Sequence, residues 1–111
     1  MSDFIEIYWT TSSLDEARRV SRCLVQERLV ACSQVIPWIE SIYMWDNKLE
    51  TTQESKVVMK THRRQFETVK QVILDNSSYE VPEIVSVAID EGNPEYLQWL
   101  EETTLTKKVQ E

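Results

Sequence analysis

Cys32 and His62 are the residues of this chain whose side chains most directly suggest metal chemistry. A thiolate such as that of Cys32 binds copper and other thiophilic ions in preference to hard cations. The alternative is a structural role, because a free cysteine in an apolar strand is often simply a small buried hydrophobe. His62 is the only histidine, so a single chain can form neither a histidine cluster nor an HExxH zinc motif. Cys32 is therefore a candidate metal ligand, and we expect His62 to be a solvated residue at the end of a strand.

Charged residues supply a second group of candidates. Glu83 is a candidate buried carboxylate, and Lys60, on a neighbouring strand, is its candidate partner or a contact for a small anion. A purely structural ion pair is the alternative, because buried charges must be paired whatever their function. Asp90, Glu91 and Glu95 form an acidic cluster whose spacing does not match a calcium-binding loop. A solvated turn is the simpler interpretation of that cluster.

Tyr43 and Trp45 are candidates for lining a pocket between subunits. Aromatic residues also dominate plain interface cores, so both interpretations stay open. The sequence contains no nucleophile elbow, no CxxC motif and, with one glycine, no glycine-rich phosphate loop. We therefore do not expect an enzyme, although an enzyme of unknown reaction is kept as an alternative.

The composition is that of a soluble globular domain. The length of 111 residues suits a single domain over residues 1–111. Hydrophobic residues make up 41% of the chain and charged residues 28%, a balance that is typical of chains that fold. The net charge of -7 disfavours nucleic acid as a partner, because binding phosphate backbones needs clustered cations. No apolar run approaches the roughly 20 residues that span a bilayer, and the chain opens on an acid where a signal peptide needs basic residues. We expect a cytoplasmic protein that binds neither membrane nor nucleic acid.

The apolar periodicity predicts the elements that must position these side chains. Two helix starts carry capping residues, namely Ser13 with Glu16 three residues later, and Asn93 before Pro94. Strands are predicted over 4–10, 30–45, 49–61 and 84–89, and helices over 14–28, 63–75 and from Asn93 onward, with a fraying tail from Thr104. This order, βαββαβ with an added C-terminal helix, predicts an α+β ferredoxin-like sandwich with a long β-hairpin.

The predicted hairpin is too long for its own domain. Its arms join at Asn47, which tolerates a left-handed turn, and reach about 45 Å at roughly 3.3 Å per residue. A compact chain of this size has a diameter of roughly 35 Å. The segment 30–45 is apolar on both faces, so we expect both faces to be covered. An overhanging ribbon that carries Trp38 and Ile42 is normally buried against another subunit, which predicts an oligomer.

Five blocks of the sequence resemble the signature of a known family. They are ERLVAC at 27–32 with IP at 36–37, SIYMWDNKLE at 41–50, KT at 60–61, YEVPEI at 79–84 and YLQWL at 96–100. In this order they resemble the CutA family of divalent-cation tolerance proteins. The resemblance implies a ferredoxin-like subunit, a homotrimer joined through its strands, and a role in divalent-cation tolerance. It makes copper the metal to consider, and subunit interfaces the place for a metal ion or small ligand.

The chain departs from the family pattern in ways that bear on function. Asn47 stands where the family usually has a glycine in the hairpin turn. Histidine precedes the YxxPE segment in some members linked to copper binding, whereas here residues 76–78 are Asn, Ser and Ser. A signalling trimer similar to the nitrogen-regulatory PII proteins, with ligands in clefts between subunits and a partner protein as target, is the alternative function.

Overall fold

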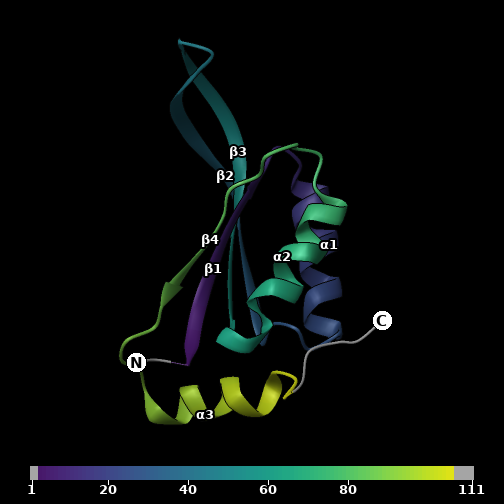
Figure 1. Ribbon diagram of the computed structural model, residues 1–111, viewed down its shortest axis with the longest axis vertical. Helices are drawn as coiled ribbons and strands as arrows, with labels where there is room; N and C mark the ends of the chain where they lie inside the picture. The colour runs from purple at the N-terminus through teal and green to yellow at the C-terminus, as the bar shows by residue number, and fades with distance from the viewer. Residues whose placement is uncertain (1–2, 107–111) are drawn as a thin grey trace.

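The computed structural model describes residues 3–106, which form one antiparallel sheet with two helices packed on one face and a third helix across one end. The elements are β1 Phe4–Thr11, α1 Leu14–Gln26, β2 Cys32–Trp45, β3 Lys48–His62, a 3-10 turn Arg63–Gln65, α2 Phe66–Asn76, β4 Ile84–Ala88 and α3 Pro94–Thr103. The strand order is β2-β3-β1-β4, with every neighbouring pair antiparallel. In Figure 1, α1 and α2 lie on one side of the sheet and α3 runs across its lower end. The ferredoxin-like α+β prediction is confirmed.

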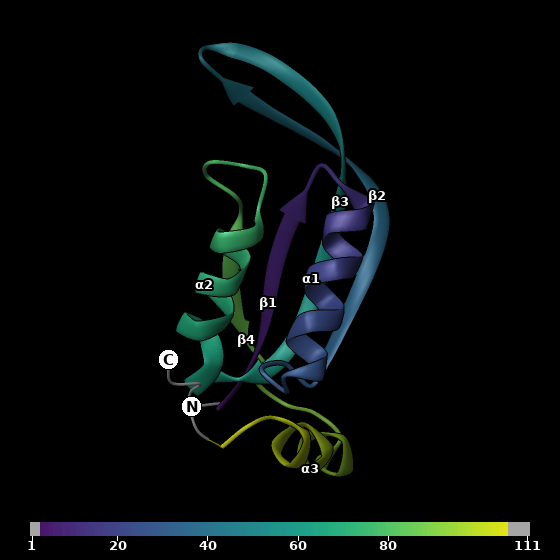
Figure 2. The same ribbon diagram turned by 90° about the vertical axis from the view of Figure 1, so that its right-hand side faces the viewer.

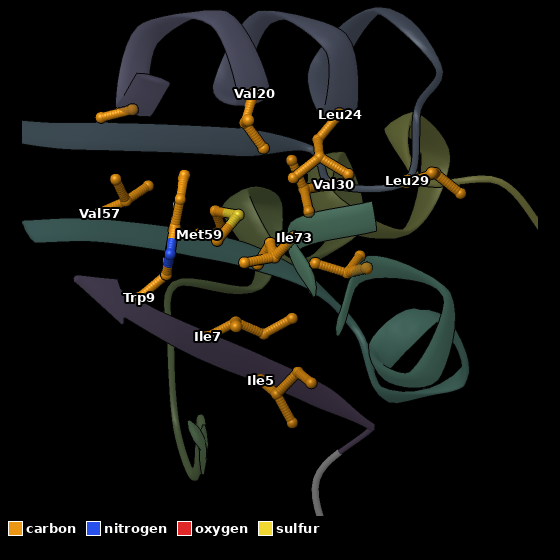
Figure 3. Packing of buried hydrophobic residues seen from close by; sticks show 12 residues of the cluster. Ile5, Ile7, Trp9, Val20, Leu24, Leu29, Val30, Val57, Met59 and Ile73 are labelled. Atoms are coloured by element: carbon orange, nitrogen blue, oxygen red, sulfur yellow. The ribbon is translucent and has the colours of Figure 1, made fainter. Parts of the chain in front are cut away.

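The hydrophobic core lies between the sheet and the two helices α1 and α2. Alternation along β1 turns Ile5, Ile7 and Trp9 toward the helices, where all three side chains are buried. From the other layer, Leu24 of α1 and Ile73 of α2 pack against them, as Figure 3 shows. Each such side chain stabilises the fold by about 1.5–3 kcal/mol through burial. The side chains that alternate with the buried ones point to the opposite face of the sheet.

The start of α1 forms only half of the predicted capping box. The Ser13 hydroxyl accepts from the Glu16 backbone N–H at 3.1 Å, as predicted. The Glu16 carboxylate does not return the bond; it accepts from the Thr11 hydroxyl at 2.6 Å and from the Ser78 backbone N–H at 3.1 Å. Glu16 is buried, so its carboxylate needs several hydrogen-bond donors. The donors from Thr11 and Ser78 provide two, whereas the capping box would provide one. The result joins α1 to the loop that precedes β4.

The end of α1 falls two residues earlier than predicted. Arg28 has a φ of 58°, in the left-handed region, and its N–H donates to the Val25 carbonyl at 3.0 Å. The Leu29 N–H then donates to the Leu24 carbonyl at 3.0 Å. This closing turn satisfies the last helical carbonyls and reverses the chain before β2 begins.

The segment after α3 does not fray at Thr104 as predicted. Thr104 is buried, and the Leu105 carbonyl accepts from Arg64 Nε at 2.7 Å and from Gln65 Nε2 at 3.1 Å. The Leu105 N–H donates to the Arg28 carbonyl at 2.9 Å. Leu105 also packs on the core. Burial and hydrogen bonding therefore order a segment whose polar composition predicted fraying. The part of the predicted tail beyond residue 106 lies outside the described residues.

The hairpin of β2 and β3 extends well beyond the helices, as predicted. Its turn has φ values of 51° at Asp46 and 63° at Asn47. A tight hairpin with the twist of a β-ribbon requires such a left-handed pair. The longest dimension of the molecule is 44 Å, and in Figure 1 the hairpin projects past the end of both helices. The ladder shifts register between Ile36 and Ile39, and Figure 2 shows the outer part of the ribbon curving away, as an irregularity of this kind favours. No described helix is long and apolar enough to cross a membrane.

Candidate interface and ligand site on the open sheet face

The sheet face opposite α1 and α2, here called the open face, has an apolar centre and a charged end. Cross-strand register places Tyr8 between Val58 of β3 and Val85 of β4. Val85, Val87 of β4 and Ile36 of β2 are each more than two fifths exposed. Val58, Tyr8 and Val85 thus form an apolar row across three strands, and exposed apolar surface of this kind is typical of a face that packs against another protein.

Cys32 and Lys60 are brought together at the charged end of this face. They are cross-strand partners on β2 and β3, and both side chains are partly exposed. Lys60 Nζ donates to Gln34 Oε1 at 2.7 Å. Tyr96 of α3 lies over the same end, and its pKa is raised by burial and then by its contact with Cys32. Two of the predicted site residues therefore lie side by side, with two neighbours that the sequence did not single out.

Glu6 completes this end from β1. It is the cross-strand partner of Lys60, yet its carboxylate accepts from the Tyr8 hydroxyl at 2.8 Å. That hydrogen bond to Glu6 raises the pKa of Tyr8. Lys56 Nζ lies 4.7 Å from the centre of the Tyr8 ring, which is a cation-π contact. The signal for Glu6 was present in the sequence, since it alternates with buried Ile5 and Ile7 and must face the other side.

A cavity of about 410 Å³ lies between the charged end of the open face and α3, and is here called the end pocket. Glu6 and Lys60 line it from the sheet, residues 89–92 from the loop after β4, and Tyr96 and Leu97 from α3. The Ile89 N–H donates to the Phe4 carbonyl at 2.9 Å and so holds the loop at the sheet edge. The described lining of the pocket thus contains one cation and two of the acidic residues that the sequence marked as a cluster.

Glu83 is not the partner of Lys60, which corrects the prediction. Ile84 pairs with Trp9 at one end of β1, whereas Lys60 pairs with Glu6 near the other end. Glu83 also precedes β4 in an exposed loop, so its carboxylate is solvated rather than buried. The buried carboxylates near this segment belong instead to Glu16 and Glu54, which accept from the Ser78 N–H and the Tyr79 hydroxyl.

Glu54 and Tyr79 form a partly buried contact at the base of the hairpin. The Tyr79 hydroxyl donates to Glu54 Oε2 at 2.7 Å. Burial, with the Glu54 carboxylate as the next cause, raises the pKa of Tyr79 to about 12. The contact ties the loop before β4 to β3 where the hairpin leaves the sheet. Neither residue was selected from sequence, because Glu54 lies in a polar run that suggested solvent.

Tyr43 and Trp45 lie on the far part of the hairpin, away from Cys32. The Tyr43 hydroxyl accepts from the Thr52 hydroxyl at 2.9 Å, and Trp45 is mostly exposed beside the turn. Cys32 and Trp45 are the two ends of β2, a separation of about 40 Å along an extended strand. Within one chain these aromatic residues and the charged end of the open face cannot line the same pocket.

The possible metal donors of the described residues lie apart in one chain. Among the described residues there is no group of three His, Cys, Asp or Glu side chains placed to hold a metal ion. The His62 Nδ1 accepts from the Arg64 backbone N–H at 3.0 Å, and its ring packs edge-on against Phe4. Burial lowers the pKa of His62. Near the YxxPE segment, the Asn76 amide donates to the Val72 carbonyl and ends α2.

The fold and the open face define a class of protein, a ferredoxin-like domain with a long hairpin and one uncovered sheet face. The sequence pattern of the CutA1 divalent ion tolerance protein family matches residues 5–103. A divalent-cation tolerance protein CutA from Thermus thermophilus is 41% identical over 95 residues, which cover 86% of this chain and 92% of that protein. The chain belongs to the CutA1 divalent ion tolerance family.

Solved structures agree with this assignment. The crystal structure of CutA1 from Oryza sativa matches with a TM-score of 0.90 and 31% identity, covering 94% of this chain and 95% of that one. The divalent cation tolerance protein from Thermus thermophilus matches with a TM-score of 0.87 and 39% identity, covering 91% and 98%. The chain spans only 56% of the chloroplastic CutA protein of Oryza sativa, to which it is 32% identical over 90% of its own length.

Proposed function

We propose that this protein serves divalent-cation tolerance as a homotrimer that binds a metal ion or small ligand where its subunits meet. The observation that carries the proposal is the uncovered apolar surface of the hairpin. Its members, here called the hairpin patch, are each 62–72% exposed and consist of Trp38, Ile42, Met44, Trp45 and Leu49.

The energetics favour assembly. Full burial of a large apolar side chain is worth about 1.5–3 kcal/mol, and the hairpin patch offers five of them per chain. The open face adds a second apolar strip, and β2 and β4 are the two edges of the sheet. Copies of the same chain can cover both surfaces and pair the edges. The expected number of subunits, three, comes from the resemblance to the CutA family.

In the proposed assembly, neighbouring copies bring together candidate ligand groups that lie far apart in one chain. Cys32 and Lys60 lie at one end of the open face, whereas Tyr43 and Trp45 lie toward the opposite end of β2, on the hairpin. A ligand site that uses both groups needs residues from neighbouring copies. A copper site at Cys32 also needs donors from neighbouring copies, since the described part of one chain offers no group of three donors.

Sedimentation and native mass spectrometry of untagged protein purified without chelators test the assembly. We expect a trimer at micromolar chain concentration, and a well-folded lone chain would contradict the proposal. Calorimetry with copper, zinc, nickel and small anions tests ligand binding. Absence of any saturable binding to the trimer would refute the ligand-binding part of the proposal. Cys32→Ser should weaken binding of a thiophilic ion. The matched control is Cys23→Ser, because Cys23 is exposed on α1.

A further inference from the structure

The end pocket has the size of a small-metabolite site. Its volume is about 410 Å³. Sites for small molecules commonly have volumes of roughly 300–1,000 Å³. Glu6 and Lys60 lie on the sheet side of the pocket, and Tyr96 supplies an aromatic wall from α3.

The two charges on the sheet side are not paired with each other. Opposite charges at directly facing strand positions usually attract, and Glu6 faces Lys60 across β1 and β3. Instead Lys60 donates to Gln34 and Glu6 accepts from Tyr8, at 2.7 Å and 2.8 Å. Lys60 forms no ion pair with any described residue. Since an ammonium has three donors and a carboxylate about four acceptor sites, each group retains capacity for a ligand.

The loop after β4 adds negative charge on one side of the pocket. Asp90 and Glu91 both line it, and both are exposed. These carboxylates with Glu6 do not constitute a group that could hold a metal ion in the described structure. Glu6, Asp90 and Glu91 outnumber Lys60, so the pocket attracts an ammonium group overall, and Lys60 is the one lining residue that favours a carboxylate on the same ligand. The charge pattern therefore suits a ligand that carries both signs.

We propose that the end pocket binds a free α-amino acid. The ligand carboxylate contacts Lys60, the ligand ammonium faces Glu6 and the acidic loop residues Asp90 and Glu91, and the ligand side chain packs against Tyr96. The inference deepens the proposed function and rests on it, because it names the ligand class for the site that contains Lys60.

Calorimetry with glycine, L-leucine, L-glutamate and L-lysine tests this inference. Isocaproate and isoamylamine are matched controls, since each resembles leucine but carries only one of its charges. We expect one site per chain and an affinity for leucine at least about tenfold above that for either control. Absence of saturable binding for all four amino acids at millimolar concentration overturns the inference, as does equal binding of leucine and isocaproate.

Substitutions locate the binding. Lys60→Met and the double change Asp90→Asn with Glu91→Gln should each weaken amino-acid binding by about tenfold or more. Lys70→Met is the matched control, because Lys70 pairs with Glu67 on α2 and does not line the pocket. Wild-type affinity in the Lys60 variant, with its circular dichroism unchanged, refutes the assignment.

Sedimentation of the same samples separates this inference from the proposed assembly. A trimer that binds no amino acid overturns the inference and leaves the assembly intact. A lone chain that binds leucine with the expected selectivity supports the inference and contradicts the assembly.

Discussion

The two halves of the hairpin are built on one hydrogen-bonded ladder but lie in different surroundings. In the near half of β3, Val57 and Met59 are fully buried against the helices. In the far half, Ile42 and Leu49 are 63% and 72% exposed, although the antiparallel register continues to the turn. Backbone pairing is therefore a local property of the ribbon, whereas burial depends on whether another element packs against it.

The two halves also differ in their polar contacts. Near the sheet, the Glu54 carboxylate is buried and held by the Tyr79 hydroxyl from a distant loop. In the far half, beyond the register shift after Ile36, the Tyr43 and Thr52 side chains bond to each other across the ribbon itself. Glu54 pairs with Ile39 directly beyond the shift, so its contact with Tyr79 ties the start of the far half to the domain, whereas the hairpin-patch residues nearer the turn stay exposed.

The largest expected effect is in the near half. Met59→Ala removes a fully buried side chain and should lower the free energy of unfolding by about 2–5 kcal/mol. Urea unfolding followed by circular dichroism measures it. Leu49→Ala on the same strand is the control and should cost less than about 1 kcal/mol. Equal losses for the two variants would contradict the contrast between the halves.

The next effect concerns assembly. Ile42→Lys places a charge in the hairpin patch and should disrupt the proposed trimer in sedimentation while the circular dichroism spectrum is unchanged, because desolvating an unpaired charge at an interface is costly. Leu74→Lys on α2, where Leu74 is 42% exposed, is the control and should leave the trimer intact. An intact trimer in the Ile42 variant would argue that the patch is not an interface.

Removing the contact at the hairpin base should have a smaller effect. Tyr79→Phe leaves the buried Glu54 carboxylate without its hydroxyl donor and should cost about 1–3 kcal/mol in the free energy of unfolding. Denaturant titration near neutral pH measures the loss. A cost close to zero would mean that solvent replaces Tyr79 at Glu54.

The same contact predicts a dependence on alkaline pH. The pKa of Tyr79 is about 12 in the folded chain, against about 10 for a free tyrosine. The contribution of Tyr79 to the free energy of unfolding is complete below pH 10. It decreases as the pH rises toward 12, because the tyrosine of the unfolded chain loses its proton first. The stability difference between wild type and Tyr79→Phe should shrink over that interval. A constant difference, or tyrosinate absorbance that lacks a late-titrating component, would be inconsistent with the raised pKa.

The smallest effect is at the hairpin turn. Asn47 has a φ of 63°. Asn47→Gly therefore relieves a left-handed backbone at the expense of a more flexible unfolded chain, and we expect the free energy of unfolding to change by less than about 1 kcal/mol. Thermal unfolding measures it, and Asn47→Val, which disfavours this φ more strongly, is the comparison. A large stabilisation by glycine would show that the turn strains the far half.

Much of the architecture followed from local patterns in the sequence. The alternation in β1 predicted a strand, and the caps at Ser13 and Asn93 predicted two helix starts. The length of the hairpin predicted that it extends beyond the domain. The predicted end of the first helix was two residues too late, because no glycine marks the left-handed turn at Arg28, and the tail from Thr104 is held by contacts of Leu105 with distant residues.

The candidate site was predicted less well than the fold. Cys32 and Lys60 were selected separately for their chemistry, but Lys60 was assigned to Glu83, which lies toward the other end of the sheet. Only the register of β2, β3 and β1 shows that Lys60 lies between Cys32 and Glu6. Tyr96 joins them from α3, an element far along the chain from all three, and no local pattern indicates where α3 packs.

The amino-acid sequence by itself determined the order of the elements, the long ribbon and the family, because periodicity, capping and signature blocks are read over short stretches. Tertiary structure alone decided which charges face each other, which carboxylates are buried and where the end pocket lies. Strand register and helix packing bring together residues far apart in the chain, and the partners chosen there depend on the whole core rather than on any one segment.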